Sequence, residues 1–133
     1  GFVTITGDGF RVLLEAIEEE KLTEIAEDIA PSLSREVALH FFKRVDFETF
    51  FQFLLAIFRY GHLGEYRVET TAEGDTMTVH HDLGPNWSLL LSRSIKQSFK
   101  SISNISPQVS IEENTFTLSF PAHTLDRGRP PEG

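Results

Sequence analysis

A phenylalanine-rich segment near the middle of the chain constrains the fold more than any other feature. Seven of the twelve Phe residues fall between residues 41 and 58. From Phe47 to Phe58, apolar side chains occupy nearly every side of the predicted helix, which Asp46 would cap and Gly61 would end. Such a helix must be covered all round, and a chain of 133 residues cannot readily hide every side of it.

This apolar surface has three interpretations. The segment is the central helix of the core, the seam of a homodimer, or the wall of an apolar ligand pocket. We expect a second copy of the chain or a bound molecule to shield it, and so predict a homodimer with a possible small-molecule effector. The candidate contact residues on this segment are Phe50, Phe51, Phe53, Leu54 and Phe58.

The first half of the chain, residues 8–61, has the apolar spacing of α-helices. Asp8 is the predicted N-cap of the first apolar stripe, and a second stripe ends before Pro31. One bent helix or two short helices would fit these stripes. Pro31 is expected to end the segment because proline cannot continue a helix from inside, and Ser32 or Ser34 would cap the next helix. The stripes consist of Phe10, Leu13, Leu14 and Ile17, then Leu22, Ile25, Ala26 and Ile29.

From Tyr66 the apolar period changes to two, which predicts β-strands. A hairpin that turns at residues 72–75 precedes a long amphipathic helix over residues 87–102. A second hairpin follows, with a two-residue loop at 113–114 that places its apolar rows on one face. The expected cross-strand pairs are Val109 with Leu118 and Ile111 with Phe116.

Together the two halves predict one α+β domain over residues 1–121. Its N-terminal helices, in the helical half 8–61, are followed by a β-β-α-β-β half over residues 63–120 with a four-stranded antiparallel sheet. Residues 122–133 contain one large apolar residue, Leu125, and are predicted to form a disordered tail.

The composition excludes several classes of function. The absence of cysteine excludes disulfides, thiolate metal sites and a Cys nucleophile. A net charge of −8 argues against binding of nucleic acid or anionic lipid by this domain. No apolar run approaches the roughly 20 residues of a membrane helix. The sequence also lacks the common catalytic motifs, so we predict a non-enzymatic protein with no cofactor and no metal.

The segment from His80 to Ser88 is the one stretch that suggests more than packing. Strand alternation sends His80 and His81 to opposite faces. They therefore cannot easily bind one metal ion. His62 and His81 could meet if the hairpin pairs them, with Asp82 as a third ligand, but this set makes a poor metal site. The favoured interpretation is that one histidine packs under Trp87 and donates a hydrogen bond to a backbone carbonyl.

The same segment contains the predicted start of the long helix. Gly84 is expected to adopt a positive φ where strand turns into helix, and Asn86 is expected to accept hydrogen bonds from free N–H groups at the helix start. Such a helix start can also bind an anion. Trp87, the only Trp, is a core residue or an interface anchor. His81, Gly84, Asn86 and Trp87 complete the candidate ligand-binding or interface residues.

The run His81-x-x-Gly84-x-x-Trp87-Ser88-Leu89 ahead of a long helix resembles a group of uncharacterised archaeal transcriptional regulators. The helical lead-in with Arg35 and Glu36 before a Phe-rich helix is similar as well, and the likeness covers residues 2–120. The resemblance implies a cytoplasmic dimer whose ribbon-helix-helix segment lies upstream and binds DNA. It brings no catalytic residues. Since the chain opens with Gly1 and not Met, we expect natural sequence upstream.

These observations predict a non-enzymatic effector or dimerisation domain of an archaeal-type transcriptional regulator, which contacts DNA only through a segment outside this chain. The first alternative is a sensor domain that binds a small molecule in an apolar pocket between the Phe-rich helix and the sheet. The second alternative is an enzyme that uses the region of His80, His81 and Asp82.

Overall fold

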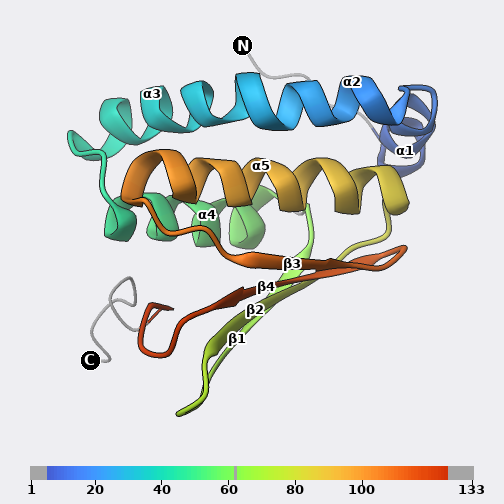
Figure 1. Cartoon of the computed structure of the whole chain (residues 1–133). Coiled ribbons are helices and arrows are strands. Elements are labelled where there is room, and N and C mark those ends of the chain that lie inside the picture. Colours follow the sequence, from blue (N-terminus) through green and yellow to red (C-terminus); the bar gives the residue numbers. More distant parts are fainter. Residues whose placement is uncertain (1–5, 62, 126–133) are drawn as a thin grey trace.

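The computed structural model describes residues 6–61 and 63–125 and has the predicted α+β architecture (Figure 1). Helices precede a β-β-α-β-β unit, as the change of apolar period indicated. In chain order the elements are α1 (Gly7–Glu15), α2 (Glu19–Glu24), the π-helical turn η1 (Ile25–Ile29), α3 (Ala30–Phe42), α4 (Phe47–Gly61), β1 (Glu65–Thr70), β2 (Asp75–His80), α5 (Pro85–Ser103), β3 (Gln108–Ile111) and β4 (Thr115–Phe120).

The four strands form one antiparallel sheet in the order β1-β2-β4-β3. Both predicted pairs of the second hairpin are confirmed, because Val109 lies opposite Leu118 and Ile111 opposite Phe116. Alternate residues of β2 and β4 are buried on one face of the sheet, while Thr and Ser side chains occupy the other. One side of this sheet is therefore part of the core.

The helices form two layers over that buried face of the sheet (Figure 1). Helices α4 and α5 lie next to the strands, and the continuous helical segment of α2, η1 and α3 runs along α5 on the side away from the sheet. Helix α5 is thus covered on two sides. Its buried Ser88, Ser92 and Ser98 are small enough to let the neighbouring elements approach closely.

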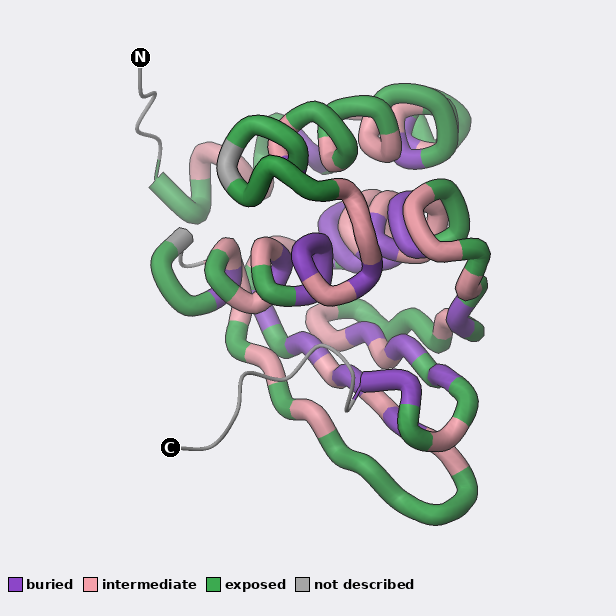
Figure 2. The backbone as a smooth tube through the Cα atoms, turned by 90° about the vertical axis from the view of Figure 1, so that its left-hand side faces the viewer, coloured by how far each residue is buried: buried purple, intermediate pink, exposed green. Residues whose placement is uncertain are grey.

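The Phe-rich helix α4 is enclosed by its own chain. The prediction that a single chain leaves part of its apolar surface uncovered is therefore wrong. Phe47, Phe50, Phe51, Leu54 and Phe58 are each at most 3% exposed. The apolar residues of this helix that are only partly covered are Phe53, Leu55 and Ile57. The rest of the helix surface carries Gln52, Ala56, Arg59 and Tyr60, which are exposed and need no cover. The central core helix is the interpretation that the structure supports, and Figure 2 shows this burial along α4, α5 and the central strands.

The helix caps follow the predictions in part. Asp46 caps α4 as expected, because its Oδ1 accepts a hydrogen bond from the Thr49 N–H at 2.8 Å and its own N–H donates to Thr49 Oγ1. That backbone N–H also lowers the pKa of the Asp46 carboxyl. At α1 the predicted Asp8 cap is wrong. Thr6 is the cap, with its Oγ1 accepting from Gly9 N at 3.0 Å.

Pro31 does not end its helix, contrary to the prediction. Elements α2, η1 and α3 run on without a break, with Pro31 in the first turn of α3. In the π-helical turn before it, the Ala30 N–H donates to the Ile25 carbonyl, five residues back. The wider turn leaves room for a residue that has no N–H and would clash in a regular helix. Neither Ser32 nor Ser34 is needed as a cap, and Ser34 Oγ instead accepts from Ser98 Oγ.

The disordered tail was predicted to begin at residue 122, but the chain is packed against the core up to Leu125. Leu125 is completely buried, and its N–H donates to Oδ2 of the buried Asp75 at 2.8 Å. The segment after β4 therefore closes the bottom of the core as far as Leu125, because one apolar side chain and one backbone hydrogen bond suffice to hold it. Residues 126–133 lie outside the described residues.

Candidate functional site

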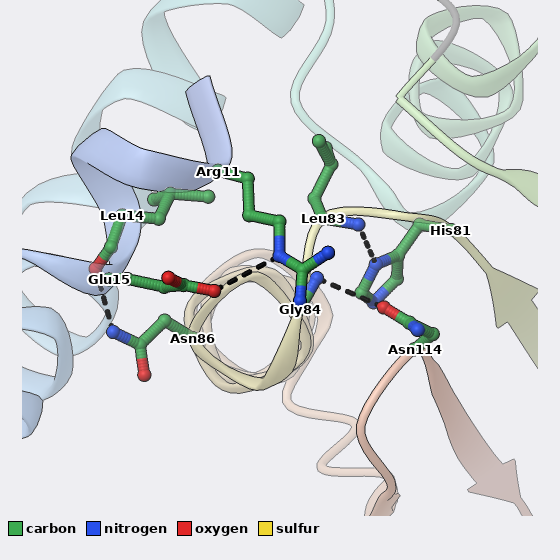
Figure 3. Close-up of polar contacts among 8 residues, drawn as sticks. All are labelled: Arg11, Leu14, Glu15, His81, Leu83, Gly84, Asn86 and Asn114. Carbon is green, nitrogen blue, oxygen red and sulfur yellow. Dashed lines mark hydrogen bonds and ion pairs between the residues drawn. The ribbon is translucent and has the colours of Figure 1, made fainter. Parts of the chain in front are cut away.

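His81 lies in a buried hydrogen-bonded chain at the junction of β2 and α5. Its Nδ1 accepts a hydrogen bond from the Leu83 N–H at 3.1 Å (Figure 3). The ring proton of the neutral histidine is therefore on Nε2, which donates to Ser88 Oγ at 2.7 Å. Ser88 in turn donates to the Glu113 carbonyl at 3.2 Å. A histidine that activates a serine must accept the hydroxyl proton. His81 instead donates a hydrogen bond to Ser88, so the pair connects two segments of the fold and is not a nucleophile with its base.

The buried position of His81 makes stability depend on pH. Burial lowers the pKa of the imidazole below 6.5, so the unfolded chain binds a proton more readily than the folded one. The stabilising contribution is complete above pH 6.5 and is lost as the pH falls from there toward the lowered pKa of the folded state. We expect the urea midpoint to fall in that window. The variant His81→Gln keeps an N–H donor but has no titrating group, so its urea midpoint should not fall in this pH window. If the midpoint of the variant falls as in the natural chain, the pH dependence does not come from His81.

Other residues of the His80–Ser88 segment also join distant parts of the chain. Asn86 was predicted to accept from the start of its own helix, and this is wrong. Its Nδ2 donates to the Leu14 carbonyl at 2.6 Å and to the Ile17 carbonyl at 3.3 Å, which closes the end of α1 (Figure 3). Trp87 is a core residue whose Nε1 donates to the Leu63 carbonyl. It packs edge to face on Phe10, with ring centroids 5.3 Å apart.

Gly84 has the predicted positive φ, with φ 86° and ψ 178°. Its N–H donates to Asn114 Oδ1 in the β3–β4 loop at 3.0 Å (Figure 3). This conformation is open almost only to glycine. His81, Gly84, Asn86 and Trp87 thus each form a hydrogen bond within the fold.

The histidine pair offers no metal site. His80 is exposed, with its Nδ1 3.0 Å from Thr115 Oγ1, whereas His81 points into the core, so the predicted split between opposite faces is confirmed. Within residues 6–61 and 63–125, no group of three His, Asp or Glu side chains is arranged to hold a metal ion. Asp82 is exposed at the strand end, and His62 lies outside the described residues.

A cleft of about 940 Å³ lies beside this junction in the described part of the chain. Its walls come from the start of α1, the end of α4, the first residues of β1, and the segment that leaves β2. Three aromatic side chains give it an apolar character, and the rings of Phe58 and Tyr66 lie 6.2 Å apart between centroids. The cleft is lined by Thr6, Gly7, Phe10, Phe58, Arg59, Leu63, Gly64, Glu65, Tyr66, His80, His81, Asp82 and Leu83.

One cation and two carboxylates are present among the lining residues. Side-chain hydrogen bonds with Tyr60 and Tyr66 raise the pKa of the Arg59 guanidinium, so this group stays charged. Glu65 and Asp82 are exposed. Such a mixture of aromatic walls and a few charged groups is typical of small-molecule sites.

The cleft coincides with the predicted site only in part. Of the predicted contact residues, Phe58 and His81 line it, whereas Phe50, Phe51, Phe53 and Leu54 belong to the core or pack against it. Sequence patterns missed Phe10, Arg59 and Tyr66, because the cleft is assembled from four separate segments and none of them has a motif. Its position, at the end of α4 and not between the length of that helix and the sheet, also differs from the prediction.

Two further findings bear on function. None of the described helices combines the length and apolar character required to cross a membrane. Comparisons with protein-family models, curated proteins and solved structures found no significant match to the chain.

Proposed function

We propose that this chain is a non-enzymatic domain that binds a small organic molecule in the cleft between α1, α4 and the start of the sheet. The observation that carries the proposal is the cleft itself, about 940 Å³ in volume and walled by Phe10, Phe58 and Tyr66. This volume lies in the range of natural ligand sites. The buried His81–Ser88 link supports a binding role over a hydrolytic one, since its hydrogen-bond direction leaves the serine without a base.

A thermal-shift screen of small aromatic compounds tests the proposal. A ligand at a concentration one hundred times its Kd stabilises the folded state by about 2.7 kcal/mol, which raises Tm by several degrees. The matched experiment uses Gly7→Phe to fill the cleft. A Cβ on Gly7 meets nothing nearer than Leu83 Cδ2 at 4.0 Å, so the fold should accept the longer side chain.

The filled variant is expected to lose the thermal shift produced by compounds that stabilise the natural chain. Asp8→Phe adds the same bulk one residue along, at an exposed position that does not line the cleft, and should retain the shift. Equal shifts in all three proteins would place binding elsewhere and overturn the proposal.

The wider role that we propose is that of the effector domain of a cytoplasmic transcriptional regulator. It is supported by the resemblance carried by His81, Gly84, Trp87 and Ser88, and by the net charge of −8, which leaves DNA binding to another segment. The sequence of the full gene product tests this role: a basic strand-helix-helix segment on the N-terminal side is the expected result, and a product without one would contradict it. The homodimer was predicted to cover the apolar surface of α4, and the chain itself already covers that surface. The dimer stays a prediction without this support.

A further inference from the structure

The charges around the cleft indicate which class of ligand it takes. We propose that the cleft binds an organic cation, a substituted ammonium group with an apolar body. This inference rests on the proposed binding function and adds the chemistry of the ligand to it.

Aromatic side chains line the cleft. Phe10 of α1 and Tyr66 of β1 are half-buried there, and Phe58 of α4 lines it with only 3% of its surface exposed. Aromatic ring faces attract cations through their quadrupole, and several rings around one space are the usual receptor for alkylated ammonium groups. A neutral apolar ligand would gain from burial against the same rings, so the lining alone does not select between the two.

The charged side chains that line the cleft are unbalanced. Glu65 and Asp82 both line the cleft, and neither forms an ion pair with another described residue. The guanidinium of Arg59 is instead engaged by the phenols of Tyr60 and Tyr66. Two carboxylates against one guanidinium leave an excess of negative charge, so a cation can neutralise what the protein itself leaves unpaired.

The net charge of the whole protein has the same sign as the excess charge of the cleft. A net charge of −8 adds a long-range attraction for cations that salt screens. An anionic ligand would have to approach Glu65 and Asp82, which form no ion pair with another described residue. The local and the overall charge therefore favour the same sign of ligand.

Titration of the isotopically labelled chain with three probes, followed by NMR, tests this inference. The probes are benzyltrimethylammonium, benzyl alcohol and phenylacetate, which share an aromatic ring and differ in charge. We expect the ammonium probe to shift the resonances of cleft residues and to bind about tenfold more tightly than the neutral one. Phenylacetate is expected to bind most weakly.

A matched pair of double variants locates the source of the preference. Glu65→Gln with Asp82→Asn removes the two carboxylates of the cleft and should bring the ammonium and neutral probes within about twofold of each other. Asp28→Asn with Glu73→Gln removes the same total charge at exposed positions outside the cleft and should preserve most of the preference.

Each outcome decides between the two proposals. If benzyl alcohol or phenylacetate binds as tightly as the ammonium probe, cation selection is wrong while the binding site stands. A preference that survives loss of the cleft carboxylates would contradict the charge-balance argument and leave the aromatic rings as its source. If none of the probes shifts cleft resonances at millimolar concentration, both the inference and the proposed function are wrong.

Discussion

Replacing Phe99 by alanine is expected to lower the free energy of unfolding by about 4 kcal/mol. The Phe99 side chain is fully buried, and its ring is surrounded by those of Phe50, Phe47 and Phe120, with centroids 4.8, 5.3 and 5.2 Å away. Truncation removes a large apolar surface and leaves a cavity that the three rings on α4 and β4 cannot close. Urea unfolding followed by far-ultraviolet circular dichroism measures the loss.

Tyr60→Ala is the control for this prediction. It removes an aromatic side chain from the neighbouring helix α4 at a position that is 74% exposed, and it should change the free energy of unfolding by less than about 0.5 kcal/mol. Losses of similar size in the two variants would show that the ring cluster around Phe99 is not the core of the fold.

Gly84→Ala is expected to cost about 2 kcal/mol of stability. At φ 86° and ψ 178° a side chain is strained whatever space surrounds it. Relief of that strain would move the Gly84 N–H away from Asn114 Oδ1 and its carbonyl away from the Ser88 N–H. The junction that positions His81 and the cleft wall would loosen together with the fold. Thermal and urea unfolding measure the change.

Gly7→Ala serves as the comparison for that substitution. Gly7 begins helix α1, and an added Cβ meets only ordinary contact with Leu83. The variant should be within about 0.5 kcal/mol of the natural chain, because alanine reduces the freedom of the unfolded state and adds no strain to the folded one. Equal stability of the Gly84→Ala and Gly7→Ala variants would contradict the backbone geometry assigned to the junction.

Most of the successful predictions depend on near neighbours in the sequence, although the Asp8 cap, a prediction of the same kind, is wrong because Thr6 caps α1. The pairing of Val109 with Leu118 follows from strand alternation and a two-residue loop, both of which are short-range properties. The Asp46 cap needs only the backbone of Thr49 three residues later. The order of helices and strands follows from the change in apolar period near Tyr66.

Predictions that required knowledge of what lies across the fold were the wrong ones. The Phe-rich helix looked too apolar for one chain because the sequence does not show that α5, α3 and the sheet surround it. Pro31 looked like a helix end because the π-helical turn that accommodates it has no sequence signature. Asn86 has its partners near residues 14 and 17, about seventy residues away.

By itself, the sequence determined the class of fold, the register of the second hairpin and the sign of the charge, since each depends on periodicity or on a simple sum. The turn of the first hairpin was predicted one residue too late, because Asp75 already pairs with Thr70. Tertiary structure alone decided which apolar surface stays uncovered, which partner each polar group of the His80–Ser88 segment finds, and where a cleft remains. These outcomes depend on the packing of elements that are distant along the chain. Phe10, Phe58 and Tyr66 become one wall only after the folded chain has brought them together.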